Sequence, residues 1–163
     1  RKIHMQTLCG MAHYDFRLKN GHSYEQAFNV MRRLRLPYSQ AQEMFRRIVF
    51  NVVVRNQDDH TKNISFLMDS SGQWSLSPAY DMGFAYNPLG AWTATHQMSI
   101  NGKFDNITRA DLLSLANANN IKNASEIIDQ VCETTAGWPE LAKNCGVPQK
   151  MIDGIVPHMF LNI

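Results

Sequence analysis

The sequence predicts a mostly α domain of the α+β class, with helices at both ends and a small β-hairpin between them. Three observations predict it: apolar residues at helical spacing over residues 24–54, apolar–polar alternation over residues 64–76, and a return to helical spacing after residue 108. Helices and strands are therefore segregated along the chain, which is typical of this class. The 163 residues are 44% hydrophobic, so we expect a single domain over residues 1–163.

Two helices in succession are expected before the hairpin. Ser23 and Gln26 have the spacing of a capping box, and the apolar residues that follow predict a helix over residues 24–35. Ser39 repeats this start pattern, and a wide apolar stripe predicts a second helix over residues 40–54. Together with the C-terminal helices, this second helix has enough apolar surface to form a core.

The segments around these helices carry weaker or different patterns. Residues 1–22 are weakly patterned and have at most a short helix. Residues 55–63 are polar and aperiodic, which indicates a loop. Apolar residues then alternate on both sides of a turn at Asp69–Gly72, which predicts a β-hairpin. A further short strand is expected near residues 96–100.

The last third of the chain is expected to be helical. Thr108 begins a capping-box pattern for a helix that ends near Ala118. A second helix is expected over residues 125–136. A third is expected from Pro148 to Leu161, because a proline near the start of a helix is favourable.

Composition excludes several classes of protein. The net charge is only +2, which argues against a protein that coats nucleic acid by charge alone. The longest apolar run, Val49–Val54, is interrupted by Asn51, so no membrane span is expected. The three cysteines, Cys9, Cys132 and Cys145, are odd in number and form no CxxC motif. They exclude a disulfide framework or a Cys-rich zinc site and favour the reducing cytoplasm.

Residues suited to chemistry gather in the polar loop and just after the hairpin. Asp58 and Asn63 stand five residues apart. Protein kinases use this separation between the Asp that accepts the proton of the substrate hydroxyl and the Asn that binds Mg²⁺. After the hairpin, Asp81-Met82-Gly83 matches the kinase metal-binding Asp-Phe-Gly, with Met in place of Phe. Either motif alone is weak, but the two in this order favour phosphoryl transfer.

The physical requirements of that reaction are consistent with these residues. Phosphoryl transfer depends on positioning and charge neutralisation more than on covalent chemistry. The hairpin can return Asp81 to Asn63, so that both share the metal while Asp58 faces the incoming hydroxyl. Lys62 can neutralise the transferring group, and His60 can hold the loop by a hydrogen bond to Asp81 or to the backbone.

The motifs resemble those of a known family. Asp58-x-His60-x-Lys62-Asn63, a hairpin and then Ser77-Pro-Ala-Tyr80-Asp81-Met82 are similar to the C-terminal kinase lobe of HipA-like proteins. These proteins are Ser/Thr kinase toxins of bacterial toxin–antitoxin modules. The Asp-x-His-x-x-Asn pattern is also similar to that of phosphoinositide kinases. Because the resemblance covers most of the chain, it implies a helical kinase C-lobe with a small β-hairpin insert.

The resemblance implies a role for each residue of the motifs. Asp58 is the expected catalytic proton acceptor, and Asn63 and Asp81 are the expected Mg²⁺ ligands. The residues expected to bind ATP are His60, Thr61, Lys62, Asn63, Tyr80 and Asp81. Asp59 occupies a position where the family often has a small residue such as Gly. Which of the two neighbouring aspartates is the proton acceptor therefore stays open.

The family also implies partners and a missing lobe. The expected partners are a protein substrate such as an aminoacyl-tRNA synthetase, a helix-turn-helix antitoxin, and DNA only through that antitoxin. None of the nine glycines is placed for a Gly-rich phosphate loop, and no strand-borne Lys with a paired Glu is readable. We therefore expect a C-lobe fragment or truncated homologue that lacks the nucleotide-covering N-lobe and does not catalyse transfer alone.

Two other interpretations stay open. One is a metal-dependent phosphoesterase with Asp58, Asp59, His60 and Asp81 as ligands. The other is a non-catalytic interaction module for an antitoxin or DNA. The remaining histidines, His96 among them, are scattered along the sequence and are expected to have ordinary surface or core roles.

Overall fold

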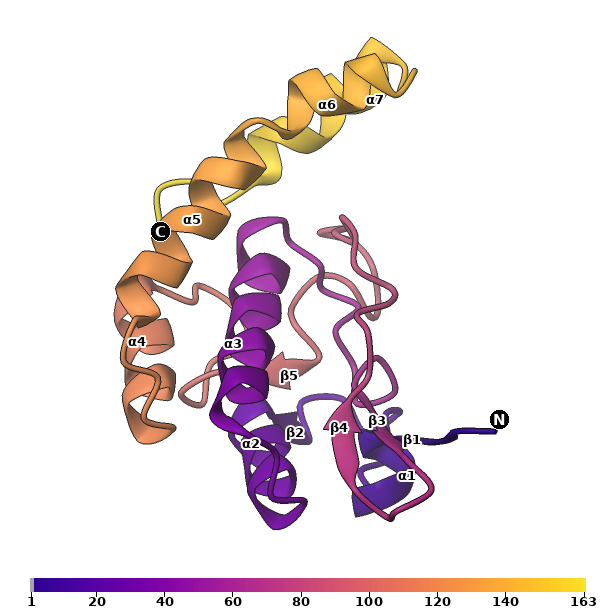
Figure 1. Ribbon diagram of the computed structural model, residues 1–163. Coiled ribbons are helices and arrows are strands. Elements are labelled where there is room, and N and C mark those ends of the chain that lie inside the picture. The colour runs from indigo at the N-terminus through magenta and orange to yellow at the C-terminus, as the bar shows by residue number, and fades with distance from the viewer. Residues whose placement is uncertain (1) are drawn as a thin grey trace.

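The computed structural model describes residues 2–163 and has an α+β fold, as predicted (Figure 1). The helices are α1 Leu8–Ala12, α2 Tyr24–Arg33, α3 Tyr38–Val53, α4 Arg109–Ala118, α5 Ala124–Ala136, α6 Trp138–Asn144, α7 Gln149–Ile155 and the 3₁₀ turn η1 Val156–His158. The strands are β1 His4–Thr7, β2 His22–Ser23, β3 Ser65–Met68, β4 Trp74–Leu76 and β5 Met98–Ser99. Among these residues, no helix combines the length and the apolar character that crossing a membrane requires.

Helices α2 and α3 confirm the predicted pair. The capping box of α2 forms as expected, because the Ser23 backbone N–H donates to Gln26 Oε1 (2.9 Å) and the Gln26 backbone N–H donates to Ser23 Oγ (3.3 Å). The start pattern at Ser39 proved wrong: α3 begins at Tyr38, two residues before the predicted start at residue 40, and without a side-chain cap. Pro37 occupies the cap position instead, and its carbonyl accepts the first helical hydrogen bonds. Proline is suited there because that position needs no N–H.

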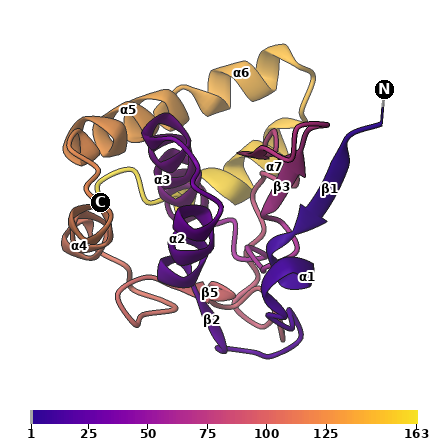
Figure 2. The same ribbon diagram turned by 60° about the horizontal axis from the view of Figure 1, so that its bottom comes forward.

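The core surrounds α3, which has α4 and α5 on one side and the hairpin on the other (Figures 1 and 2). Phe45, Ile48 and Val49 of α3 are completely buried, as are Ile127 and Ile128 of α5. Burying each of these side chains contributes about 1.5–3 kcal/mol before conformational entropy is subtracted. The core therefore holds α3 in place, and with it the point at which the polar loop begins.

Strands β3 and β4 form the predicted hairpin, and β1 adds a third antiparallel strand that was not expected. Phe66 of β3 pairs with Leu76 of β4 and with Gln6 of β1. The weakly patterned N-terminus joins this sheet because the edge of β3 offers backbone partners that local sequence cannot reveal. The strand expected near residues 96–100 is confirmed in shortened form as β5, which pairs in parallel with β2.

The C-terminal segment differs most from expectation. Helices α4 and α5 are where the sequence predicts them, but α6 was not expected. The single helix predicted to reach Leu161 is instead α7 followed by η1, because Pro157 has no N–H to continue α-helical bonding. In Figure 2, α5 and α6 run along one side and the chain then doubles back through α7. It returns to the end of α3, where the Phe160 backbone N–H donates to Val53 O (2.8 Å).

Candidate functional site

The polar loop after α3 has side chains that alternate between the interior and the surface. Gln57, Asp59 and Thr61 are buried. The side chain of Asp58 is 47% exposed and that of His60 is 20% exposed. Alternation of this kind is what extended backbone produces. The two neighbouring aspartates therefore face different surroundings.

A second segment, which follows the hairpin, is tied against this loop by backbone and side-chain hydrogen bonds. The Gln57 backbone N–H donates to Ala85 O (3.0 Å), and the Ala85 N–H donates to Arg55 O (3.1 Å). The Tyr80 hydroxyl donates to Lys62 O (2.6 Å). These contacts place Asp81 beside the loop, as the hairpin was expected to do. The hydroxyl of Tyr80 thus holds the loop itself.

Asp59 is a buried structural acceptor. Its Oδ2 accepts from the Tyr24 hydroxyl (2.7 Å), and its Oδ1 accepts from the Gln97 backbone N–H (2.7 Å). His96 Nδ1 lies 2.8 Å from Oδ2 and is the donor, since a carboxylate only accepts. His96 is 2% exposed, so it has a core role, as expected. With both oxygens bonded inside the fold, Asp59 leaves Asp58 as the aspartate that faces outward.

The residues from His60 to Lys62 divide between the two sides of the loop. His60 Nε2 lies 4.0 Å from Asp58 Oδ1, and its ring packs edge-on against Phe16. The sequence suggested a hydrogen bond from His60 to Asp81 or to the backbone, and among the described residues the ring forms neither, since its Nδ1 is buried without a partner. Thr61 Oγ1 donates to a backbone carbonyl in the interior, and Lys62 Nζ lies 4.3 Å above the Phe16 ring.

A small cavity brings the expected metal ligands to one place. His60, Asn63 and Asp81 all line it. Asn63 Nδ2 donates to the backbone carbonyl of Asp58 (2.9 Å), so its amide oxygen remains the atom that can coordinate a cation. A carboxylate and an amide oxygen are hard donors, and Mg²⁺ is typically held by few protein oxygens together with waters and phosphates. The residues present therefore fit Mg²⁺.

The phosphoesterase interpretation finds no support in this arrangement. That activity needs a cluster of protein ligands able to hold metal without nucleotide. Within residues 2–163 no group of three or more His, Cys, Asp or Glu side chains is placed to hold a metal ion. Asp59, one of the four ligands that the interpretation requires, is already bonded on both oxygens.

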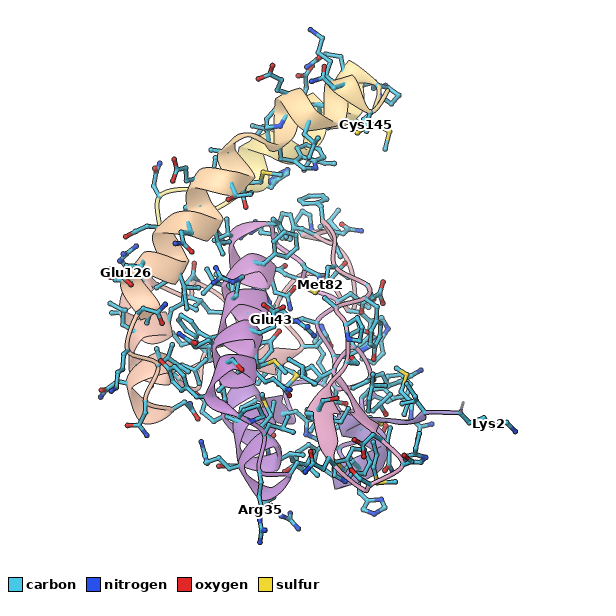
Figure 3. The ribbon with its side chains drawn as sticks, in the orientation of Figure 1. Lys2, Arg35, Glu43, Met82, Glu126 and Cys145 are labelled. Atoms are coloured by element: carbon cyan, nitrogen blue, oxygen red, sulfur yellow. The ribbon has the colours of Figure 1, made fainter. Side chains whose placement is uncertain are left out.

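A larger apolar groove, of about 580 Å³, lies beside this cavity. It runs between α3, α5 and α6, and Phe50, Trp138 and Met159 contribute to its walls. Met82, the residue after Asp81, lines both the groove and the small cavity. Figure 3 shows Met82 beside α3, close to Glu43. The polar cavity, and not the larger groove, is lined by Asn63 and Asp81.

Sequence reasoning missed the residues that support the loop from within. Tyr24, Asn51, Asn56 and His96 all connect to Asp59 or Asp81 through buried hydrogen bonds. One sequence feature pointed to them: Asn51 interrupts the apolar run of the second helix, where a buried amide needs a partner. The others carry no local pattern that predicts their role.

Comparison with known proteins gives one family and several relatives. The family model of the HipA-like C-terminal domain matches residues 1–138. A protein of Sinorhizobium fredii that bears the name Putative kinase Y4dM is 31% identical over 121 residues, which is 71% of this chain and 29% of that protein. The serine/threonine-protein kinase toxin HipA of Shewanella oneidensis is 34% identical over 65 residues, which is 40% of this chain and 15% of the toxin.

A solved structure shares the fold. A chain in the complex of HipA, HipB and operator DNA from Shewanella oneidensis MR-1 superposes with a TM-score of 0.60 at 24% identity. The match covers 74% of this chain and 28% of that one. The chain thus spans less than a third of the length of each of these proteins.

Proposed function

This chain belongs to the family of HipA-like C-terminal domains, and on that premise we propose that it is the C-terminal lobe of a serine/threonine protein kinase. The enzyme transfers the γ-phosphate of ATP to a protein hydroxyl. One observation carries the proposal: Asp58 is partly exposed beside His60, while His60, Asn63 and Asp81 line one cavity together. The arrangement matches the separation of roles in phosphoryl transfer, with one acceptor for a proton and two oxygen donors for a cation.

Asp58 is proposed as the proton acceptor because of where its oxygens lie. Its side chain is 47% exposed, so a substrate hydroxyl can approach it. His60 Nε2 lies 4.0 Å from it, beyond hydrogen-bond distance, and leaves that approach open. The loop backbone beneath Asp58 is fixed, since Asn63 donates to the Asp58 carbonyl and Asp59 is anchored in the core.

Asn63 and Asp81 are proposed to hold Mg²⁺ with the ATP phosphates. Bound Mg²⁺ would neutralise phosphate charge and orient the transferring group. Lys62 is proposed to add positive charge next to the phosphates. Tyr80 keeps the two segments together by its bond to Lys62 O. The hydroxyl of Thr61 faces the interior, so any contact of Thr61 with ATP is proposed through its backbone.

The biological setting is proposed from the relatives. One relative is a kinase toxin, and the solved neighbour is bound to HipB and operator DNA. We propose a helix-turn-helix antitoxin as partner of this protein and a protein substrate such as an aminoacyl-tRNA synthetase. DNA would be contacted only through the antitoxin, which agrees with the net charge of only +2.

A radiolabelled-ATP assay tests the proposal. Protein kinases cover ATP with a Gly-rich loop and hold its phosphates with a strand-borne Lys, which this sequence does not show. The purified 163-residue chain should therefore give no detectable autophosphorylation with Mg²⁺ and should bind ATP more weakly than the roughly micromolar-to-millimolar range of working enzymes. The protein in which this domain is joined to a nucleotide-covering lobe should do both. Robust transfer by the 163-residue chain would contradict this division of labour.

A further inference from the structure

A continuous chain of buried side chains joins Asp59 to Asp81. The Tyr24 hydroxyl donates to Asp59 (2.7 Å), and Asn51 Nδ2 donates to the Tyr24 oxygen (3.0 Å). Asn56 Nδ2 then donates both to Asn51 Oδ1 (3.0 Å) and to the backbone carbonyl of Asp81 (3.1 Å). Every side chain in this relay is at most 7% exposed, apart from that of Asp81, which takes part through its backbone.

The direction of each bond follows from the acceptor at one end. The Asp59 carboxylate can only accept, so the single Tyr24 proton is committed to it. The Tyr24 oxygen is then left to accept, which turns the amide nitrogen of Asn51 toward it. Asn51 Oδ1 consequently faces Asn56, whose nitrogen donates both of its protons. Burial and the neighbouring Asp59 also raise the pKa of Tyr24 well above its usual value, so its proton stays in place.

The relay lies along the wall of the cavity proposed for the cation. Tyr24, Asn51, Asn56 and Asp59 line it together with Asp81. Tyr24 comes from α2 and Asn51 from the otherwise apolar face of α3, both far in sequence from the loop motifs. Buried polar groups are costly unless each is satisfied, and a satisfied network gives one well-defined arrangement.

The end of the relay meets a backbone that needs support. Asp81 has φ = 55°, in the left-handed region that residues other than glycine seldom adopt. The bond from Asn56 holds the carbonyl of this residue. Asp81 and Asn63 line the same cavity, and the direction in which the Asp81 side chain leaves the backbone depends on that conformation.

We propose that Tyr24, Asn51 and Asn56 are positioning residues that fix the Asp81 backbone relative to Asn63, so that both present oxygens to one divalent cation. The inference rests on the proposed function in taking this cation as the Mg²⁺ of phosphoryl transfer. It goes further in assigning a role in cation affinity to three residues outside the expected pair of cation ligands. The relay acts as a unit, because each member sets the orientation of the next.

Mn²⁺ binding by the 163-residue chain tests the proposal without requiring catalysis. Mn²⁺ is paramagnetic, so it broadens the NMR signals of nearby groups, and those of Asn63 and Asp81 should disappear first during a titration. Tyr24→Phe breaks the relay at one end and keeps the ring. Asn56→Ala breaks it at the other end. Tyr38→Phe is the matched control, because it removes a hydroxyl that bonds only Lys122 N at the far end of α3.

Both relay variants should raise the Mn²⁺ concentration needed for half-broadening by about 10-fold or more, the effect of losing a group that orients a metal ligand. Asn56→Ala should have the greater effect because it contacts Asp81 directly, and Tyr38→Phe should match the parent chain. Circular dichroism at the titration temperature confirms that each variant is folded. A purely structural role would lower the melting temperature of the variants and leave their Mn²⁺ titrations unchanged, which would overturn the proposal.

Two further outcomes separate this inference from the proposed function. If Mn²⁺ binding responds to both relay variants but the protein joined to its N-lobe transfers no phosphate, the positioning role stands and the kinase proposal fails. If Mn²⁺ does not broaden Asn63 and Asp81 in the parent chain, the positioning role is overturned, whatever activity the larger protein has. A response to Asn56→Ala without one to Tyr24→Phe would also overturn the relay as a unit.

Discussion

The two faces of the loop after α3 use similar residues for opposite purposes. On the inner face, the side-chain oxygens of Asp59 and Thr61 form hydrogen bonds within the fold. On the outer face, Asp58 and His60 are partly exposed and Lys62 is at the surface. Two adjacent carboxylates therefore have opposite surroundings, since Asp59 is buried and Asp58 is partly exposed like a surface aspartate.

The difference shows how a reactive segment is held without covering its reactive groups. A surface loop is usually mobile because its polar groups bond to water. In this loop every second side chain is hydrogen-bonded within the fold. The backbone that carries the exposed side chains between them is therefore held in place. The environment, and not the residue type, decides which carboxylate serves chemistry and which serves structure.

The largest effect is expected from the outer aspartate. Asp58→Asn, made in the protein joined to its N-lobe, should reduce phosphoryl transfer by about 10²–10⁴-fold, because the substrate hydroxyl loses its proton acceptor. The melting temperature should stay within the small range typical of surface changes. Radiolabel transfer and calorimetry measure the two, with Asp153→Asn, an exposed change on α7, as the control. Full activity in Asp58→Asn would show that the exposed aspartate is not the proton acceptor.

The inner aspartate should show the reverse pattern. Asp59→Asn places an NH₂ group among donors and should lower the free energy of unfolding by about 1–3 kcal/mol, because a buried donor then loses its acceptor. Urea denaturation measures this loss. Activity, assayed where the variant is folded, should fall less than in Asp58→Asn. Unchanged stability combined with complete loss of transfer would show that Asp59 is the proton acceptor.

A smaller effect is expected at Thr61. Thr61→Val keeps the side-chain shape but leaves the Tyr14 carbonyl without its bond, which should cost about 1 kcal/mol of stability. Thr61→Ser restores the hydroxyl and should recover that part of the loss. The KM for ATP should stay the same in both variants. A large rise in KM with unchanged stability would mean that the Thr61 hydroxyl contacts the nucleotide.

The smallest effect on phosphoryl transfer is expected at Asp111, a buried carboxylate far along the chain that serves as a reference for a purely structural role. Burial raises its pKa, but hydrogen bonds from Lys103, Asn101 and Thr108 outweigh burial and hold the pKa below its usual value. A lowered pKa contributes stability that is complete above about pH 4 and is lost as the pH falls further. The melting temperatures of the parent chain and Asp111→Asn should therefore converge in acid. A constant difference down to about pH 2 would contradict this.

Local patterns accounted for the elements that are stabilised locally. The capping boxes at Ser23 and Thr108 mark helix starts that the structure confirms, since their hydrogen bonds lie within four residues. The alternation around Asp69–Gly72 predicted the hairpin for the same reason. Strand β1 escaped prediction because its partner β3 lies far along the chain, where His4 pairs with Met68.

The candidate site divides in the same way. Sequence by itself determined the residue types and spacings: Asp58 five residues before Asn63, and Asp81 after one hairpin. These follow from covalent order, and they suffice to indicate phosphoryl transfer. Only the tertiary structure decided that Asp59 turns inward to Tyr24 and His96, 35 and 37 residues away. Which of two adjacent carboxylates is desolvated depends on what packs against it, and packing partners are brought together by the fold and not by their distance along the chain.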